Sequence, residues 1–273
     1  MPPAWRRSPS RSATRQEPTE ASTAAGYGEA MDHAAVLLGT RRPLLVQPHY
    51  DDNDIGAAGT VRRWVLAGAD VTYVSVTDDV AGVLDPHLAD DDARTVLRAE
   101  QARAGALLGV ARQVRLDWPD AGGLEHVALR DQVIDLIRDV QPDLVCTVDP
   151  WLPDEAHQDH VRTGLAVAEA VLLAGLPRVR RSTGDRAWSV SHLALYDTAS
   201  PNVVIDTSAV QAERHAVLDC YTAQFTPDDL AALHIGLDRY ERALATAHAV
   251  DGTHGEGWRV RPMAALHIGR PKP

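Results

Sequence analysis

The stretch PLLVQPHYDDNDIGAAG, residues 43–59, decides the fold. It begins with an apolar run at residues 43–46, which is short enough for a buried β-strand. Polar residues follow at once, from Pro48 to Asp52, and they open a helical stretch with small residues at positions 56–59. A strand that leads through a polar turn into a helix is the repeating unit of a parallel α/β sheet.

This alternation continues along the chain. Helical stretches that each precede a strand are expected at residues 54–67, 91–108 and 128–140, after a short one at 30–38. The strands are expected at residues 71–76, 113–116 and 144–148. We therefore predict an α/β fold with a Rossmann-like, mostly parallel sheet and helices on both faces.

The second half of the chain extends the same pattern. It predicts a helix at 160–176, strands at 189–196 and 202–205, helices at 209–224 and 228–248, and a last strand at 259–267. Residues 1–27 are rich in Ser, Thr, Ala, Pro and Arg and have few large apolar side chains, which is typical of a loosely held tail. We expect a single domain over residues 28–273.

Composition excludes several classes of protein. The net charge of −11 argues against nucleic acid and anionic membranes as partners, because both need a basic surface. No apolar run approaches the length of a membrane span. The two cysteines, Cys146 and Cys220, lie in apolar or helical patterns far apart and are expected to be reduced, which favours the cytoplasm.

Two polar clusters follow predicted strands. PHYDD at residues 48–52 comes after the strand at 43–46, and HQDH at residues 157–160 comes after the strand at 144–148 and a short loop. Ligands of open α/β sheets bind at the carboxyl ends of the strands, so both clusters are expected in one crevice. Taken singly, each cluster also fits a helix N-cap or a surface histidine.

The residue types indicate a metal-dependent hydrolase. Catalytic zinc takes three protein ligands, drawn from His and Asp or Glu, and leaves a position for water. His49 and Asp52 lie three residues apart across a strand-to-helix turn and can face one ion, which leaves Asp51 free as a general base. The second cluster supplies one ligand and one helper, but spacing alone leaves open which of His157 and His160 is the ligand.

The sequence resembles the LmbE-like or PIG-L-type zinc-dependent N-acetylglucosaminyl de-N-acetylases. Their early His-Pro-Asp-Asp reads HYDD here at residues 49–52, and their later His-x-Asp-His reads HQDH at 157–160. The likeness extends over most of the chain from residue 43 to 224. It includes RAE at 98–100, LGV at 108–110, Leu116 to Asp120, PDLV at 142–145, NVVID at 202–206 and a helix ending at Gln224.

The resemblance implies a role for each motif residue. His49, Asp52 and His160 would bind one zinc ion per chain, and Asp51 would be the general base. His157 would act as acid or oxyanion stabiliser, and Asp159 would orient it. A site with two His and one carboxylate also accepts Fe(II), Co(II) or Mn(II).

Four residues are expected to contact substrate. Arg98 and Asp120 match family positions that tend to hold sugar hydroxyls or a neighbouring charged group, although a solvated helix charge and a loop turn explain them equally well. Tyr50 replaces the family's proline and places a phenol near the metal. Trp151 lies in the loop before the second cluster. The C-terminal stretch RPMAALH at 261–267 departs from the family pattern, so contacts made there are expected to differ.

The expected reaction is hydrolysis of the acetamide of an N-acetylglucosamine-type sugar. The apolar segment at 80–92 and the loop with Trp151 favour a bulky glycoconjugate, such as a teicoplanin-type glycopeptide pseudoaglycone. The alternative is a mycothiol-pathway deacetylase or S-conjugate amidase. A different class is a non-catalytic sugar- or nucleotide-binding module, although no Gly-x-Gly-x-x-Gly follows a strand. Sequence leaves the oligomeric state open.

Overall fold

The computed structural model describes residues 32–267. The predicted tail at residues 1–27 lies outside the described residues, and so do residues 28–31 and 268–273 of the predicted domain. Among the described residues, no helix is both long and apolar enough to cross a lipid bilayer.

Within the described residues, seven strands form one sheet in the order β3-β2-β1-β4-β5-β7-β6. The first five strands are parallel, and β7 runs antiparallel to both of its neighbours. This is the mostly parallel α/β sheet that the sequence predicts. The strands are β1 (Pro43–Gln47), β2 (Thr72–Thr77), β3 (Arg112–Trp118), β4 (Leu144–Val148), β5 (His192–Tyr196), β6 (Val203–Asp206) and β7 (Gly255–Pro262).

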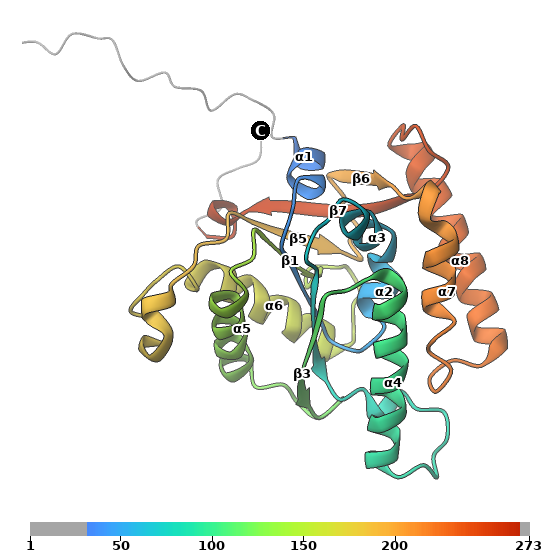
Figure 1. The fold of residues 1–273 in the computed structure, drawn as a ribbon, viewed down its shortest axis with the longest axis horizontal. Coiled ribbons are helices and arrows are strands. Elements are labelled where there is room, and N and C mark those ends of the chain that lie inside the picture. The colour runs from blue at the N-terminus through green and yellow to red at the C-terminus, as the bar shows by residue number, and fades with distance from the viewer. Residues whose placement is uncertain (1–31, 268–273) are drawn as a thin grey trace, which may run out of the picture. The chain divides into compact units, whose positions relative to one another are not determined.

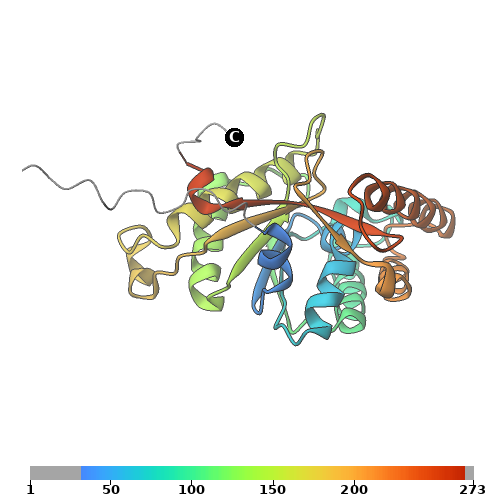
Figure 2. The same ribbon diagram turned by 90° about the horizontal axis from the view of Figure 1, so that it is seen from above.

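Helices cover both faces of the sheet, as Figures 1 and 2 show. Helices α5 and α6 pack on one face, and α1, α3, α4 and α7 contribute to the core on the other. Helix α8 packs against β7, which lies beside the edge strand β6. The helices are α1 (His33–Leu38), α2 (Asp52–Gly56), α3 (Ala58–Leu66), α4 (Asp90–Leu108), α5 (His126–Val140), α6 (Gln158–Leu173), α7 (Gln211–Leu218) and α8 (Pro227–Ala247).

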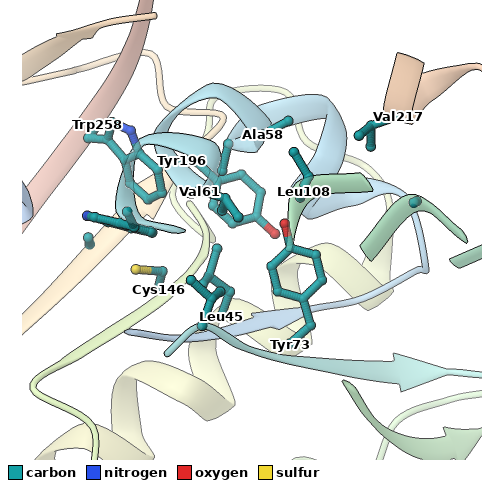
Figure 3. Close-up of a cluster of buried hydrophobic side chains, with 14 of the residues drawn as sticks. Leu45, Ala58, Val61, Tyr73, Leu108, Cys146, Tyr196, Val217 and Trp258 are labelled. Atoms are coloured by element: carbon teal, nitrogen blue, oxygen red, sulfur yellow. The ribbon is translucent and has the colours of Figure 1, made fainter. Parts of the chain in front are cut away.

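The apolar run of β1 joins the two halves of the core. Successive side chains of a strand point to opposite faces, so Leu45 packs into one cluster while Leu44 and Val46 pack into the other. Figure 3 shows the cluster around Leu45, which contains Cys146 of β4 and Trp258 of β7. Both cysteines of the chain are free and buried, as predicted.

Three predicted elements differ from the structure. The helix expected at 209–224 is α7, which begins at residue 211 and already ends at residue 218. The helical stretch expected at 54–67 is divided into α2 and α3 at Ala57, where the carboxylate of Glu256 accepts hydrogen bonds from the backbone N–H groups of Gly59 and Thr60. Sequence spacing does not reveal a cap that comes from almost two hundred residues away. The last strand, expected at 259–267, is β7 and begins at residue 255, because residues 255–258 pair with β6.

Helix α8 begins with a capping box. The Thr226 hydroxyl accepts a hydrogen bond from the Asp229 N–H at 3.2 Å, and the Asp229 carboxylate accepts one from the Thr226 N–H at 3.0 Å. Removing a helix N-cap costs about 1 kcal/mol. Thr226→Ala is therefore expected to lower the free energy of unfolding by about that amount in urea titrations. Thr246→Ala, in the last turn of α8, is the matched control, and an equal loss in both variants would contradict the role of the cap.

Candidate active site

The two polar clusters lie where the strand order of the sheet reverses. Strand β1 pairs with β2 on one side and with β4 on the other, so the chain leaves β1 and β4 toward opposite faces. Ligands of open α/β sheets bind at this point, beyond the carboxyl ends of the strands. A cavity of about 320 Å³ lies there, and both clusters line it. Its polar lining residues are His49, Asp51, Asp52, Asp79, Asp120, His157, His160 and Gln224.

Three of these side chains converge on a single point. His49, Asp52 and His160 each offer one ligand atom, and the three atoms lie within 4.8 Å of one another. One oxygen of Asp52 lies 3.3 Å from His49 Nδ1, and the other lies 3.3 Å from His160 Nε2. The His49 backbone N–H also donates to Asp52 at 2.7 Å, which holds the carboxylate between the two imidazoles. The cluster has the donor atoms of a metal site.

The electrostatics of this cluster suit a positive charge. Burial works against a charged His49, but the carboxylates of Asp120 and Asp52 outweigh it and raise its pKa to about 11. Burial likewise opposes ionisation of Asp52, yet contacts with His160 and His49 lower its pKa well below the usual range. The carboxylates thus attract protons to both imidazoles. A divalent cation would supply the same positive charge, so the donor set fits a metal ion.

The carboxylate of Asp51 also lines the cavity, where the backbone of Asp51 itself is its hydrogen-bond partner and no other side chain among the described residues donates to it. Burial, followed by the nearby charge of Asp52, raises the pKa of Asp51 to about 7. A carboxyl group with a pKa near neutrality that lines a cavity can exchange a proton with a water molecule there.

The structure places Asp120 against the outer edge of the His49 ring. Its carboxylate lies 3.3 Å from His49 Nε2, and its second oxygen accepts a hydrogen bond from the Ala81 N–H at 3.0 Å. His49, Asp120 and His157 form a second set of ligand atoms within 4.8 Å. Asp52 faces Nδ1 of His49 and Asp120 faces Nε2. A neutral imidazole has one free lone pair, so only one of the two nitrogens can bind a metal at a time.

His157 is the N-cap of α6, and its ring is exposed to the cavity. Its Nδ1 accepts a hydrogen bond from the Asp159 backbone N–H at 3.3 Å, which leaves Nε2 as the donor of the neutral ring. The Asp159 carboxylate points elsewhere: it accepts from the Ala121 N–H at 2.9 Å and lies 3.9 Å from His49 Nε2. Asp159 therefore contacts His157 through its backbone N–H, because both residues lie at the start of the helix.

Three predicted substrate contacts do not line the cavity. Arg98 pairs with Asp117 at 2.8 Å on the surface. The Tyr50 side chain is fully buried, with the Arg115 guanidinium 5.6 Å from its ring centroid, because its position in the turn directs it into the core. Trp151 is half exposed beneath the guanidinium of Arg259. Asp120 is thus the one of the four predicted contacts that lines the cavity.

Two polar lining residues were not among the predicted site residues. Asp79 follows β2 with a left-handed backbone (φ 60°), and its carboxylate accepts hydrogen bonds from the Tyr50 N–H at 3.0 Å and from Gln224 Nε2 at 2.9 Å. Its place at the carboxyl end of a strand is a signal that could have identified it. Gln224 lies in the segment between α7 and α8 and has no such local signal.

A buried hydrogen-bond network fixes the position of the first polar cluster, residues 48–52. Gln47 Oε1 accepts from the Asn53 N–H at 2.7 Å, and Asn53 Oδ1 accepts from the Tyr196 hydroxyl at 2.9 Å. The Asp54 carboxylate accepts from the hydroxyls of Tyr73 and Tyr221. The rings of Tyr73 and Tyr196 belong to the core cluster in Figure 3, so packing of the core and placement of the first cluster are linked.

Comparisons with known proteins give consistent results. The family model for GlcNAc-PI de-N-acetylase (PIG-L) matches residues 44–171, which include both polar clusters. A diacetylchitobiose deacetylase of Thermococcus kodakarensis is 32% identical over 233 residues, 84% of this chain and 86% of that protein. A 1D-myo-inositol 2-acetamido-2-deoxy-alpha-D-glucopyranoside deacetylase of Kineococcus radiotolerans is 31% identical over 194 residues, 59% of this chain and 52% of that protein.

A solved structure agrees over nearly the whole fold. The N,N'-diacetylchitobiose deacetylase from Pyrococcus horikoshii superposes with a TM-score of 0.78 and 29% identity, and the match covers 87% of this chain and 90% of that one. All three of these proteins are named as deacetylases.

Proposed function

This chain belongs to the PIG-L family and is an N-deacetylase for GlcNAc-type sugars, and we propose that it works with a divalent metal, zinc, held by His49, Asp52 and His160. The observation that supports this best is the Asp52 carboxylate between two imidazoles, with the free carboxylate of Asp51 beside it. A zinc ion bound there would supply Lewis-acid activation of water and of the acetamide carbonyl.

Asp51 is the proposed general base. Its carboxylate lines the cavity directly beside the proposed ligand Asp52, where it can take a proton from water and later return it. The water oxygen adds to the acetamide carbon while Asp51 accepts the proton. The carbon–nitrogen bond then breaks, acetate is released, and the sugar amine leaves with a proton.

His157 is the proposed electrophilic helper. The Asp159 N–H occupies its Nδ1, so Nε2 presents a proton to the cavity, where it can stabilise charge on the acetamide oxygen or protonate the leaving amine. The Asp159 N–H fixes the tautomer and orientation of the ring, while its carboxylate holds the loop at Ala121.

Asp120 acts on His49 in this proposal. Its carboxylate faces Nε2 of the ring and is anchored by the Ala81 N–H, which fixes the tautomer with Nδ1 free for the metal. Asp120 also lines the cavity, so its predicted contact with a sugar hydroxyl is part of the proposal. Asp79 and Gln224 line the same cavity and offer further polar groups to the sugar.

The size and the lining of the first cavity bear on the class of substrate. A cavity of about 320 Å³ with a polar lining suits the acetamide-bearing sugar itself. Trp151 does not line it, which weakens the argument from sequence for a bulky apolar aglycone. The glycopeptide pseudoaglycone, the mycothiol-pathway alternative and the cytoplasmic location stay predictions. The names of the relatives add diacetylchitobiose as a candidate substrate.

The test is release of free amine from a panel of N-acetylated conjugates. The panel contains diacetylchitobiose, an N-acetylglucosaminyl inositol and a teicoplanin-type pseudoaglycone. Protein stripped with a chelator is expected to be inactive, and one equivalent of zinc is expected to restore turnover of one class of conjugate. Fe(II), Co(II) and Mn(II) are compared in parallel because the donor set accepts them.

Two negative results of this test would lead to different conclusions. Undiminished activity of the stripped protein would refute the metal-dependent mechanism. Absence of amine release from every conjugate, with one zinc bound per chain, would count against deacetylation of these sugars and would favour another amide or a binding role.

A further inference from the structure

A second cavity adjoins the proposed metal site. It measures about 510 Å³ and shares Ala121 and His157 with the first cavity. A ligand that occupies both cavities would lie against His157. The remaining lining residues of the second cavity are Gly122, Gly123, Ala156, Gln158, Asp159 and Arg162.

Arg162 is the one basic side chain, apart from the imidazole of His157, among the described residues that line this cavity. It lies near the start of α6, is partly buried, and makes no hydrogen bond or ion pair with any residue that the structure describes. Its nearest carboxylate in sequence, Asp159, is engaged by the Ala121 N–H and faces His49. The guanidinium therefore has its charge and donors available to a ligand.

The opposite wall leaves the guanidinium accessible. Residues 121–123 carry at most a methyl group, and Gly123 adopts a left-handed backbone (φ 91°). A side chain at Gly123 would start 3.8 Å from Arg162 Nη1, so this loop passes close to the guanidinium without covering it. The second cavity combines an unpaired cation with walls of small residues.

The two cavities differ in charge. Four carboxylates line the first cavity, those of Asp51, Asp52, Asp79 and Asp120, and they disfavour an anionic group there. The second cavity has the carboxylate of Asp159, which is hydrogen-bonded, and the free cation of Arg162. A substrate that is neutral at its acetamide sugar and anionic beyond it matches this arrangement.

We propose that the second cavity binds the group attached to the N-acetyl sugar, and that Arg162 pairs there with a carboxylate or phosphate of that group. This inference rests on the proposed function. Arginine presents a planar fork of donors that matches both anions, so its loss removes charge and geometry together.

The test compares two matched glycosides of N-acetylglucosamine. The carboxymethyl glycoside carries a carboxylate, and the carbamoylmethyl glycoside is its neutral isostere; a 2-phosphoethyl glycoside distinguishes phosphate from carboxylate. Arg162→Gln is expected to lower the ratio of kcat/KM for the anionic over the neutral glycoside about tenfold. Arg162→Lys should keep part of the ratio. Arg239→Gln, an exposed arginine on α8 outside both cavities, should leave it unchanged.

Binding gives a readout that is independent of turnover. The carboxymethyl glycoside is titrated by calorimetry into zinc-loaded Asp51→Asn protein, with and without Arg162→Gln, and weaker binding in the double variant is expected. An unchanged ratio and unchanged binding would overturn the role of Arg162 while amine release still supports the deacetylase. Binding that depends on Arg162 without amine release by the wild type would instead count against the proposed reaction.

Discussion

Asp51→Asn is expected to lower kcat about 10²–10⁴-fold, which is the usual contribution of a general acid–base group. Asparagine keeps the shape of the side chain but cannot accept the proton of a water molecule. No other side chain among the described residues donates a hydrogen bond to the Asp51 carboxylate, whose partner is the backbone of Asp51 itself, so the change removes no contact between side chains. Amine release and metal content, measured on the same preparations, check this result.

The same substitution at Asp52 is expected to have a different effect from Asp51→Asn. Asp52→Asn removes the negative charge of the carboxylate that lies between His49 and His160 and replaces one of its two oxygens by an amide nitrogen, so it is expected to lower zinc content as well as activity. Asp70→Asn, an exposed aspartate outside both cavities, should change neither. Full activity of Asp51→Asn would refute its role as base, and loss of zinc from that variant would assign it to the metal site. A non-catalytic binding module would have no turnover to lose.

Arg214→Met is expected to destabilise the fold by about 3–5 kcal/mol, the cost of leaving buried charges without their partner. Arg214 lies 2.6 Å from the Glu241 carboxylate and 3.8 Å from that of Glu256, and all three side chains are almost fully buried. Arg214 also donates to the Ile55 carbonyl at 3.0 Å, and Glu256 caps α3. The cluster therefore ties α7, α8 and β7 to the helices behind the active site. Urea titrations measure the loss.

This destabilisation is expected to depend on pH. Burial, followed by the charge of Glu256, raises the pKa of Glu241 from 4.5 to about 7, and burial also raises that of Glu256. Folded protein with raised carboxyl pKa values holds protons that the unfolded chain has released, so this contribution to stability is greatest below about pH 4.5 and falls as pH rises to about 7. Without Arg214 the carboxyls take up protons more readily still. The loss should thus be smaller at pH 6 than at pH 8.

Two variants control for this effect. Arg242→Met removes the exposed pair with Asp238 on α8 and is expected to cost less than about 1 kcal/mol. The double variant Arg214→Met, Glu241→Gln should recover part of the stability, because it also removes one of the unpaired carboxylates. An Arg214→Met loss as small as that of Arg242→Met, or one that grows toward acid pH, would show that the cluster does not stabilise the fold in this way.

Local pattern alone predicted much of the fold. The apolar runs of β1 and β4, the helical periods between them and the polar residues at their ends are all encoded within short segments. A parallel α/β sheet brings the carboxyl ends of neighbouring strands to one edge, so the meeting of HYDD and HQDH followed from strand order. This geometry is why the sequence by itself placed His49, Asp51, Asp52 and His160 in one crevice.

Tertiary structure decided the rest of the site, because the remaining contacts join segments far apart in sequence. Asp120 meets His49 through the loop after β3, and Gln224 reaches Asp79 across 145 positions. Sequence spacing also does not show which way a side chain points. The turn directs Tyr50 into the core, and Arg98 pairs with Asp117.

The sequence by itself thus determined the fold class, the family and the chemical types gathered at the strand ends, since these depend on local periodicity and motif. Only the tertiary structure decided which side chains share the cavity, which carboxylate faces which imidazole nitrogen, and that Arg162 is unpaired beside a second cavity. The physical reason is that burial and pairing depend on every element packed around a residue, while a sequence pattern reports only its neighbours along the chain.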